Sequence, residues 1–163
     1  MGPVARDLIP LAILACLTIG AARAAGVPAA TDLAADARLM REKRIPMVVF
    51  FSRNGCPWCE RARREYIGPL AADPATEALV RQVDVDRDAP LKDFSGKETS
   101  HRALSRRYNV RLAPTLMFLG PDGEAIAETI VGFRLADFYG TYIDYALAIS
   151  RDRLRQGDAA ARP

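Results

Sequence analysis

The order of apolar and polar positions predicts alternating helices and strands between residues 31 and 150. Residues 31–43 begin with residues suited to capping, carry apolar side chains at helical spacing and are followed by Pro46, so they predict a helix. Residues 47–51 are continuously apolar and rich in residues that favour strands. This pattern is typical of a central strand that is buried on both faces of a sheet.

A second helix is predicted to begin at Pro57, because the missing N–H of a proline costs nothing in the first helical turn. Gly68 and the proline after it are expected to end this helix near Tyr66. Residues 73–81 predict a further helix, and residues 83–86 predict a short strand. A strand, a helix and a strand within about 40 residues form a βαβ unit, so the two strands should be parallel.

The second half of the chain contains a predicted helix and a predicted hairpin. Residues 98–108 predict the helix after a polar loop. Residues 115–119 predict a strand, and a Gly-Pro-Asp-Gly turn leads into an antiparallel strand at residues 124–131. The helix is expected to turn inward the side chains of Ala103, Leu104 and Tyr108.

Apolar side chains after Gly132 recur at the spacing of one helix face, which predicts an amphipathic helix laid on the sheet. After Arg151 the chain is charged and then rich in alanine, so residues 151–163 are expected to form a flexible tail. Together the elements predict an α/β fold with a central mixed sheet of about four strands flanked by helices, in one domain spanning residues 25–150. The face of the last helix consists of Leu135, Phe138, Tyr139, Tyr142, Ile143, Ala146 and Ile149.

Residues 1–24 have the features of a secretory signal peptide. Arg6 precedes a largely apolar run that ends in Ala22-Arg23-Ala24, with small residues at the two positions that a signal peptidase reads. Cleavage after Ala24 would place the protein in the periplasm. Two alternatives stay open. One is an uncleaved membrane anchor, although an apolar run of about 15 residues is short for a helix that spans a membrane. The other is lipidation at Cys16.

Overall composition is that of an ordinary globular protein, with 50% hydrophobic and 26% charged residues. The formal net charge of +3 is too small to indicate nucleic-acid binding. Outside the N-terminal apolar segment, Cys56 and Cys59 are the only cysteines. Export would place them where disulfides persist.

The two cysteines lie where the buried strand passes into the helix that begins at Pro57. A thiolate attacks disulfides, and the free N–H groups at a helix start stabilise an anion at Cys56. We therefore expect Cys56 to be the nucleophile that forms a mixed disulfide, and Cys59 to be the thiol that resolves it. A permanent disulfide staple is the alternative, but a two-residue gap closes too small a loop to add much stability.

Metal and haem sites are not expected. Zinc needs about four ligands, and beyond the two cysteines only His101 is available as a soft ligand. Covalent haem needs a histidine directly after the second cysteine, where Glu60 stands. His101 lies at the polar start of a predicted helix and is expected to be solvated. Hence no cofactor is predicted.

Four arginines flank the cysteines, and two interpretations of them stay open. They stabilise a thiolate at Cys56 or attract acidic partners, or they form a solvated helix face that Glu60 and Glu65 partly neutralise. Phe94, in the polar loop after the second strand, is a candidate apolar contact near the site. The arginines are Arg53, Arg61, Arg63 and Arg64.

Several motifs of the chain occur together in a fixed order. They are the strand at residues 47–51, Cys-Pro-Trp-Cys at 56–59, Tyr-Asn-Val-Arg-Leu-Ala-Pro-Thr at 108–115, Gly-Pro-Asp-Gly at 120–123 and Val131-Gly132 before the last helix. With these motifs the chain resembles the thioredoxin superfamily over about residues 44–149. The exported context and the inserted loop at residues 88–99 resemble most the periplasmic SoxW-type thioredoxins.

The resemblance implies a cis peptide bond between Ala113 and Pro114 beside the active disulfide. Ala113 then presents its N–H and C=O to a bound peptide. The resemblance also implies that Pro57 and Trp58 contact partners and tune the reduction potential. It further implies a monomer that acts on protein disulfides or dithiols and is served by a membrane electron donor.

The chain departs from the superfamily pattern beneath the cysteines. Phe50 stands where cytosolic thioredoxins have a buried Asp that assists proton transfer, and Gln82 stands in place of its Lys partner. Proton transfer must then rely on water or on another acid, with Glu60 and Glu65 as candidates.

We therefore expect a periplasmic thiol–disulfide oxidoreductase that acts as a reductant. One alternative is a disulfide oxidant or isomerase, but the chain has no room for the additional domain that such enzymes usually carry. The other alternative is a binding or chaperone module whose cysteine pair is incidental.

Overall fold

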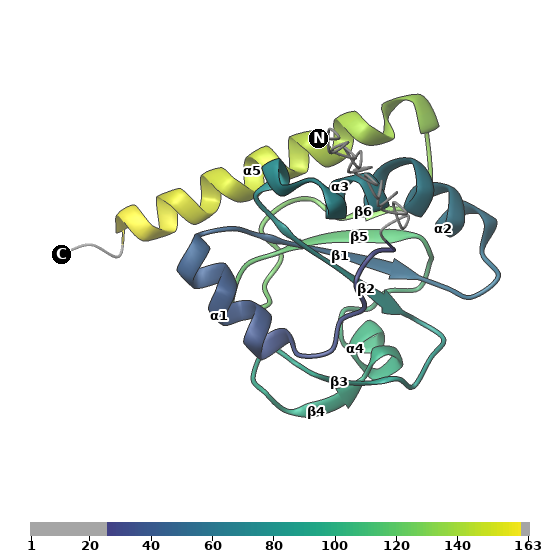
Figure 1. Cartoon of the computed structure of the whole chain (residues 1–163), viewed down its shortest axis with the longest axis horizontal. Coiled ribbons are helices and arrows are strands. Elements are labelled where there is room, and N and C mark those ends of the chain that lie inside the picture. The colour runs from purple at the N-terminus through teal and green to yellow at the C-terminus, as the bar shows by residue number, and fades with distance from the viewer. Residues whose placement is uncertain (1–25, 161–163) are drawn as a thin grey trace, which may run out of the picture.

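The computed structural model describes residues 26–160, so the expected signal sequence and Cys16 lie outside the described residues. A four-stranded mixed sheet has the strand order β2-β1-β5-β6, and a separate two-stranded sheet pairs β3 with β4. Figure 1 shows these elements, with α2, α3 and α5 above the sheet and α1 and α4 below it. The strands are β1 (Met47–Ser52), β2 (Leu79–Asp84), β3 (Pro90–Lys92), β4 (Glu98–Ser100), β5 (Thr115–Leu119) and β6 (Ile130–Val131). The α-helices are α1 (Leu33–Lys43), α2 (Pro57–Ala62), α3 (Gly68–Ala72), α4 (His101–Arg107) and α5 (Tyr139–Ala160).

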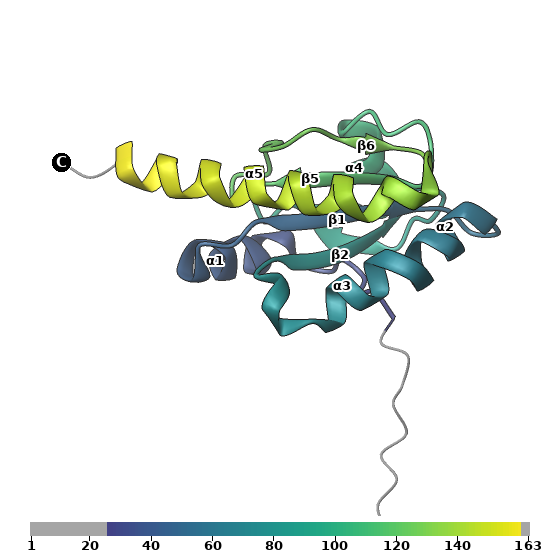
Figure 2. The ribbon, with the colours of Figure 1, turned by 90° about the horizontal axis from the view of Figure 1, so that it is seen from above.

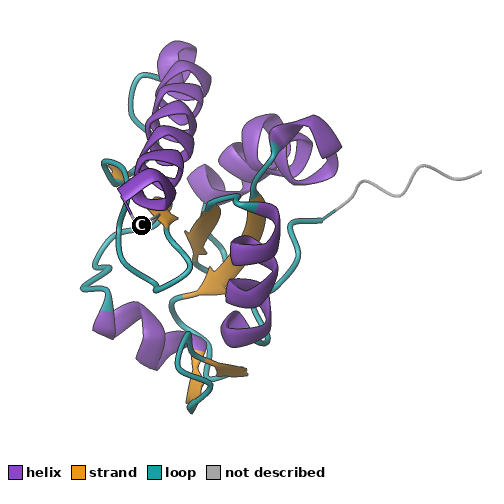
Figure 3. Ribbon diagram, turned by 90° about the vertical axis from the view of Figure 1, so that its left-hand side faces the viewer, coloured by secondary structure: helices purple, strands orange, loops and turns teal. Residues whose placement is uncertain are grey.

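The predicted α/β fold with a mixed sheet of about four strands is confirmed. All six residues of β1 are buried, and β1 pairs in parallel with β2 and antiparallel with β5. One core cluster joins the sheet to α2 and α5, and the other joins it to α1 and α4. Figures 2 and 3 show the strands between these two layers of helices.

The helix that begins at Pro57 runs further than predicted. It continues through a π-helical turn, η1 (Arg63–Ile67), into α3, so Gly68 and Pro69 do not end it. The N–H of Gly68 bonds to the carbonyl of Arg63, five residues back, and this wider turn accommodates a proline that has no N–H to donate.

The prediction of a helix at residues 73–81 is wrong, and the strand predicted at residues 83–86 is present but begins and ends earlier, as β2, which pairs in parallel with β1 as predicted. Asp73 caps only a 3-10 turn, Pro74–Thr76, after which Glu77 adopts a left-handed backbone with φ of 46°. The chain then enters β2 at Leu79, four residues before the predicted start, and pairs along the whole of β1. Pairing with the central strand outweighs the local helix signal here.

The last helix is longer and turned differently than predicted. A 3-10 turn, Ala136–Phe138, precedes α5, so Leu135 and Phe138 are exposed rather than part of the buried face. Tyr142 is exposed too, and Ile149 is half-buried. The helix continues to Ala160, through most of the segment expected to be a flexible tail. Its buried apolar side chains are Tyr139, Ile143, Ala146 and Leu147.

Three smaller differences concern the second half of the chain. The polar loop contains β3, and β4 follows it where the helix was expected to begin. Helix α4 buries Leu104, but Ala103 is exposed and Tyr108 is half-buried. The strand expected at residues 124–131 is reduced to β6 and one bridge between Leu119 and Ala125.

Candidate active site

The cysteine pair lies between the end of β1 and the start of α2. Gly55 has a φ of 66°, a left-handed conformation that suits glycine and turns the chain into the helix. Cys56 is the N-cap of α2, and its Sγ accepts a hydrogen bond from the N–H of Cys59 at 3.1 Å. Sulfur at this position meets the positive end of the helix, which favours a thiolate when the pair is reduced.

Cys56 and Cys59 form a disulfide with a Cα separation of 5.2 Å. The two sulfurs differ in environment. Cys56 is half-buried, whereas Cys59 is fully buried within the core cluster beneath α2. An external disulfide therefore has more direct access to Cys56 than to Cys59.

The loop before β5 faces the disulfide. The peptide bond between Ala113 and Pro114 is cis, as the resemblance implied. The carbonyl oxygen of Ala113 lies 3.9 Å from Cys56 Sγ. Pro114 is buried, and its carbonyl oxygen accepts the N–H of Gly132 at 2.8 Å, so the loop is held against the end of β6.

Apolar side chains are exposed on both sides of this loop and on α2. Trp58 projects from the first turn of α2, Leu112 precedes Ala113, and Val131 lies opposite Thr115 in the β5–β6 register. A hollow of about 180 Å³ is lined by Leu112, Val131 and neighbouring residues of the loop. Solvent-exposed apolar groups beside a disulfide offer a contact surface for an apolar stretch of a protein.

Phe133 belongs to this site although the sequence did not single it out. Its ring stacks on Trp58 with 6.0 Å between centroids, and the Arg61 guanidinium lies 5.2 Å from its centroid. Phe133 also contacts Tyr139, with 4.6 Å between ring centroids. An aromatic residue directly after Val131-Gly132 was the available signal, but only the fold brings it to α2.

Beneath the cysteines, the position of Phe50 is apolar and fully buried. Phe50 lies in the same core cluster as Cys59 and opposite Gln82 in the β1–β2 register. Neither acid proposed from the sequence lies free beside Cys59. Glu60 is ion-paired with Arg63, and Glu65 bonds to Arg61 at 2.9 Å and to Arg64 at 3.0 Å.

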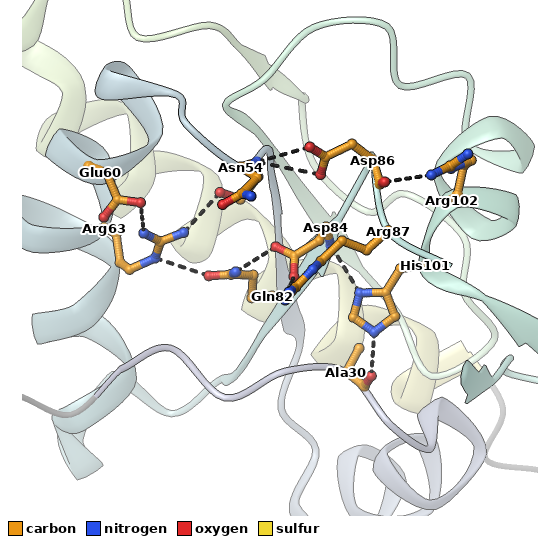
Figure 4. A network of polar contacts seen from close by, with 11 residues as sticks. Ala30, Asn54, Glu60, Arg63, Gln82, Asp84, Asp86, Arg87, His101 and Arg102 are labelled. Carbon is orange, nitrogen blue, oxygen red and sulfur yellow. Dashed lines mark hydrogen bonds and ion pairs between the residues drawn. The ribbon is translucent and has the colours of Figure 1, made fainter. Parts of the chain in front are cut away.

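Of the four arginines that flank the cysteines, Arg53 is exposed, and the three on the helix fall into two groups. Arg61 and Arg64 are paired with Glu65, and the hydrogen bond from Arg61 is the main cause that lowers the pKa of the Glu65 carboxyl. They match the solvated helix face. Arg63 points inward instead, donating to Gln82 Oε1 at 3.1 Å and to Ser52 Oγ at 2.9 Å (Figure 4).

His101 is buried, so the prediction that it is solvated is wrong. Its Nδ1 accepts the N–H of Asp84 at 2.9 Å, and its Nε2 lies 2.9 Å from the carbonyl oxygen of Ala30 (Figure 4). Because Nδ1 accepts a hydrogen bond, the proton of the neutral ring is on Nε2, and this N–H donates a hydrogen bond to the carbonyl oxygen of Ala30. The ring ties α4 to the end of β2 and to the segment before α1, which is a structural role.

Phe94 does not lie near the cysteines. It packs against the core cluster of α1 and α4 and closely approaches Gly123 in the hairpin turn. Within residues 26–160, no three His, Cys, Asp or Glu side chains are grouped as a metal site requires, and no helix is long and apolar enough to cross a membrane.

The chain combines a thioredoxin-like α/β fold with a disulfide at a helix start, between cysteines that are separated by two residues, and with a cis-proline beside it. Proteins that carry out thiol–disulfide exchange have this arrangement. A sequence profile described as a thioredoxin-like domain matches residues 33–147. The chain belongs to the thioredoxin-like family. No curated protein matches the sequence.

Solved structures agree on the fold. Fasciola hepatica thioredoxin superposes with a TM-score of 0.52 at 20% identity, covering 74% of this chain and 96% of that chain. Mitochondrial thioredoxin 3 of Saccharomyces cerevisiae gives a TM-score of 0.50 at 18% identity, covering 75% and 93%. The periplasmic thioredoxin SoxS of Paracoccus pantotrophus gives 0.46 at 16% identity, covering 64% and 98%, a similarity too low to carry an argument.

Proposed function

We propose that the protein is a periplasmic thiol–disulfide oxidoreductase that reduces disulfides of partner proteins, in the manner of the SoxW-type thioredoxins. The observation that carries this proposal is the accessible Sγ of Cys56, placed at a helix start and 3.9 Å from the carbonyl oxygen of Ala113. An extended partner segment can bond to the backbone of Ala113 while its disulfide meets Cys56. The exposed Pro57 and Trp58 complete this surface, and the buried Pro114 holds the backbone of Ala113 in place beside it.

The reaction transfers two electrons from the cysteine pair to the partner. The Cys56 thiolate attacks one sulfur of the partner disulfide, which forms a mixed disulfide and releases the other sulfur as a thiolate that takes up a proton. The Cys59 thiolate then attacks Cys56 Sγ, which closes the Cys56–Cys59 disulfide and releases the second partner thiol. A dithiol of a membrane electron donor returns the two electrons in the reverse sequence.

Trapping tests this function. A Cys59→Ala chain is expected to hold its partner as a mixed disulfide through Cys56, visible as a larger species that reductant collapses and mass spectrometry identifies. A Cys56→Ser/Cys59→Ala chain is the matched control and is expected to trap nothing. Equal capture by both chains, or none by either, contradicts the proposal. If a Cys56→Ser chain sustains the biological role, the protein is a binding module instead.

The location is tested by the mass of the exported protein in a Gram-negative host. Cleavage after Ala24 predicts a periplasmic chain that begins at Ala25. A full-length mass in the membrane fraction supports the anchor, and a lipid-modified mass that begins at Cys16 supports the lipoprotein. Either of these results contradicts a freely released periplasmic enzyme.

A further inference from the structure

In the resolving step Cys59 has to react as a thiolate, although it lies in the apolar core, where a charged group is disfavoured. Cys59 is fully buried and lies in an apolar cluster with Phe50, Ala62 and Ile67. Apolar surroundings disfavour a thiolate relative to a thiol. Cys59 must nevertheless be a thiolate when it attacks the mixed disulfide, so a charge or dipole close to it has to compensate.

The sheet beneath α2 changes from apolar to polar at this point. Side chains two residues apart in a strand share a face, so Phe50 and Ser52 of β1 face α2 together with Gln82 and Asp84 of β2. The parallel register places Phe50 opposite Gln82 and Ser52 opposite Asp84. Ser52 is fully buried, and Gln82 Nε2 donates to Asp84 Oδ1 at 2.7 Å.

Arg63 connects this polar strip to the helix that carries the cysteines. It lies one turn after Cys59, and its backbone N–H bonds to the Cys59 carbonyl. Its guanidinium donates to Gln82 (Figure 4) and to Ser52, which hold it under the helix. The guanidinium carbon lies 5.6 Å from the centroid of the Phe50 ring. The positive charge is therefore fixed beside the ring that packs with Cys59.

Among the charged and titratable groups near Cys59 in the described part of the chain, Arg63 is the cation whose side chain points inward. From the same helix come Arg63, its ion-pair partner Glu60 and the hydroxyl of Tyr66, which bonds to Ala136. Strand β2 contributes Asp84, which bonds to Gln82 and lies 3.8 Å from the guanidinium of the exposed Arg87, and α5 contributes Tyr139 from the shared core cluster. The side chain of Glu60 is 61% exposed and that of Arg63 is 23% exposed, so water screens the carboxylate more than the guanidinium.

We propose that Arg63 is a positioning residue of the redox site, whose guanidinium, held by Ser52 and Gln82, stabilises the thiolate of Cys59. In the resolving step this thiolate bonds to Cys56 Sγ while the bond from Cys56 to the partner breaks and the partner leaves as a thiolate. The proton released from the Cys59 thiol goes to solvent water. Arg63 thereby raises the reduction potential, because it stabilises the reduced pair.

The test measures the fraction of Cys59 present as thiolate, from the thiolate absorbance near 240 nm between pH 6 and 10. It uses the full chain with Cys56→Ser and Cys16→Ala, so that Cys59 is the titrating thiol. Arg63→Gln is expected to lower that fraction about tenfold at a pH below both midpoints. Arg63→Lys, which keeps the charge, should lower it much less. Unchanged titration in Arg63→Gln overturns the proposal.

Two matched variants separate an effect of charge from one of folding. Arg61→Gln changes an arginine of the same helix that is 42% exposed, lies over Phe133 and is paired with Glu65, and it should leave the Cys59 titration in place. Glu60→Gln removes the partner charge of Arg63 and should increase the thiolate fraction. A shift of the same sign in Arg63→Gln and Glu60→Gln indicates a structural disturbance and contradicts the proposal.

The reduction potential supplies an independent readout in chains that retain both cysteines. Equilibration with dithiothreitol at the alkaline end of the range should show that Arg63→Gln favours the disulfide about tenfold more than the parent chain, which corresponds to about 30 mV. An equal potential contradicts the proposal. The proposal rests on the proposed thiol–disulfide exchange. Both measurements work without a partner protein, so an unchanged thiolate fraction of Cys59 can be distinguished from a failure to trap a partner.

Discussion

On the sheet face covered by α1 and α4, the buried side chains of Asp93 and His101 are each held by two or more bonds, whereas the buried hydroxyl of Tyr139, on the face covered by α2 and α5, is not. Asp93 accepts four hydrogen bonds or ion-pair contacts, from Ser95 N, Ser95 Oγ, Lys97 N and Arg107. His101 bonds through both ring nitrogens. Across the sheet, the hydroxyl of Tyr139 is buried without a partner among the described residues, and Cys59 lies in the same cluster.

This difference indicates that one face of the sheet contributes mainly to the stability of the fold and the other to the redox reaction. The bonds of Asp93 and His101 fix the β3–β4 segment and α4, away from the cysteines. The face covered by α2 and α5 contains the disulfide, the inward-pointing Arg63 and the unbonded hydroxyl of Tyr139. A redox site needs groups whose charge changes during the reaction, and the cysteines are such groups. Substitutions on the α1–α4 face should therefore change stability and leave redox activity intact, and substitutions at the cysteines should do the reverse.

The largest effect is expected from Cys56→Ser. Without the nucleophile, reduction of a protein disulfide such as those of insulin should fall by about a thousandfold or more, to the background rate. The free energy of unfolding of the reduced chain should change little, because Cys56 is half-buried and the substitution is conservative. A turbidity assay and urea unfolding measure the two quantities. Residual activity near that of the parent chain would remove Cys56 from the mechanism.

Asp93→Asn is expected to lower the free energy of unfolding by about 2–3 kcal/mol, since a buried carboxylate loses charge-assisted hydrogen bonds. Asp122→Asn is the matched control, because Asp122 accepts one backbone N–H in an exposed turn and its loss should stay within about 0.5 kcal/mol. Insulin reduction by both variants should match the parent chain. A loss of activity in Asp93→Asn would contradict the separation of the two faces.

The pH dependence of stability follows from the same carboxylate. Hydrogen bonds from Ser95, followed by that from Arg107, hold the pKa of Asp93 well below its ordinary value of 3.8. The stabilisation is thus complete above that ordinary value and is lost as the pH falls towards the lowered pKa of the folded state. Urea unfolding from pH 7 to pH 3 should show the gap between the parent chain and Asp93→Asn narrowing below about pH 4. A constant gap would contradict this assignment.

Tyr139→Phe should produce the smallest effect, a free energy of unfolding that is unchanged or raised by up to about 1 kcal/mol. Burial raises the pKa of Tyr139, and its hydroxyl has no partner within the described chain. Tyr66→Phe is the control from the same aromatic cluster, because it deletes a 2.8 Å hydrogen bond to Ala136 and should lower stability by about 1 kcal/mol. Equal losses in both variants would show that the Tyr139 hydroxyl is bonded.

Local patterns in the sequence predicted the parts of the molecule whose structure is set locally. Strand β1 is an uninterrupted apolar run, and the start of α2 is marked by Pro57 after Cys56, so the position of the cysteine pair followed. The start of β2 did not follow, because residues 79–82 become a strand by pairing with β1 rather than by their own propensity.

The surroundings of the cysteines depended on contacts between distant segments. Phe133 reaches Trp58 only because β6 brings the chain back beside α2. Arg63 looked like its neighbours Arg61 and Arg64 in the sequence, and only the position of Ser52 and Gln82 beneath the helix turns it inward. His101 is buried because the backbone of Asp84 and Ala30 offers it two partners, which no local pattern records.

The most direct test of the central claim, that Cys56 is the attacking sulfur and Cys59 the buried resolving one, is alkylation of the reduced chain with less than one equivalent of iodoacetamide. Peptide mapping then reports which cysteine carries the label. The difference in exposure and the helix start at Cys56 predict that the label falls mainly on Cys56. Preferential labelling of Cys59 would contradict the account.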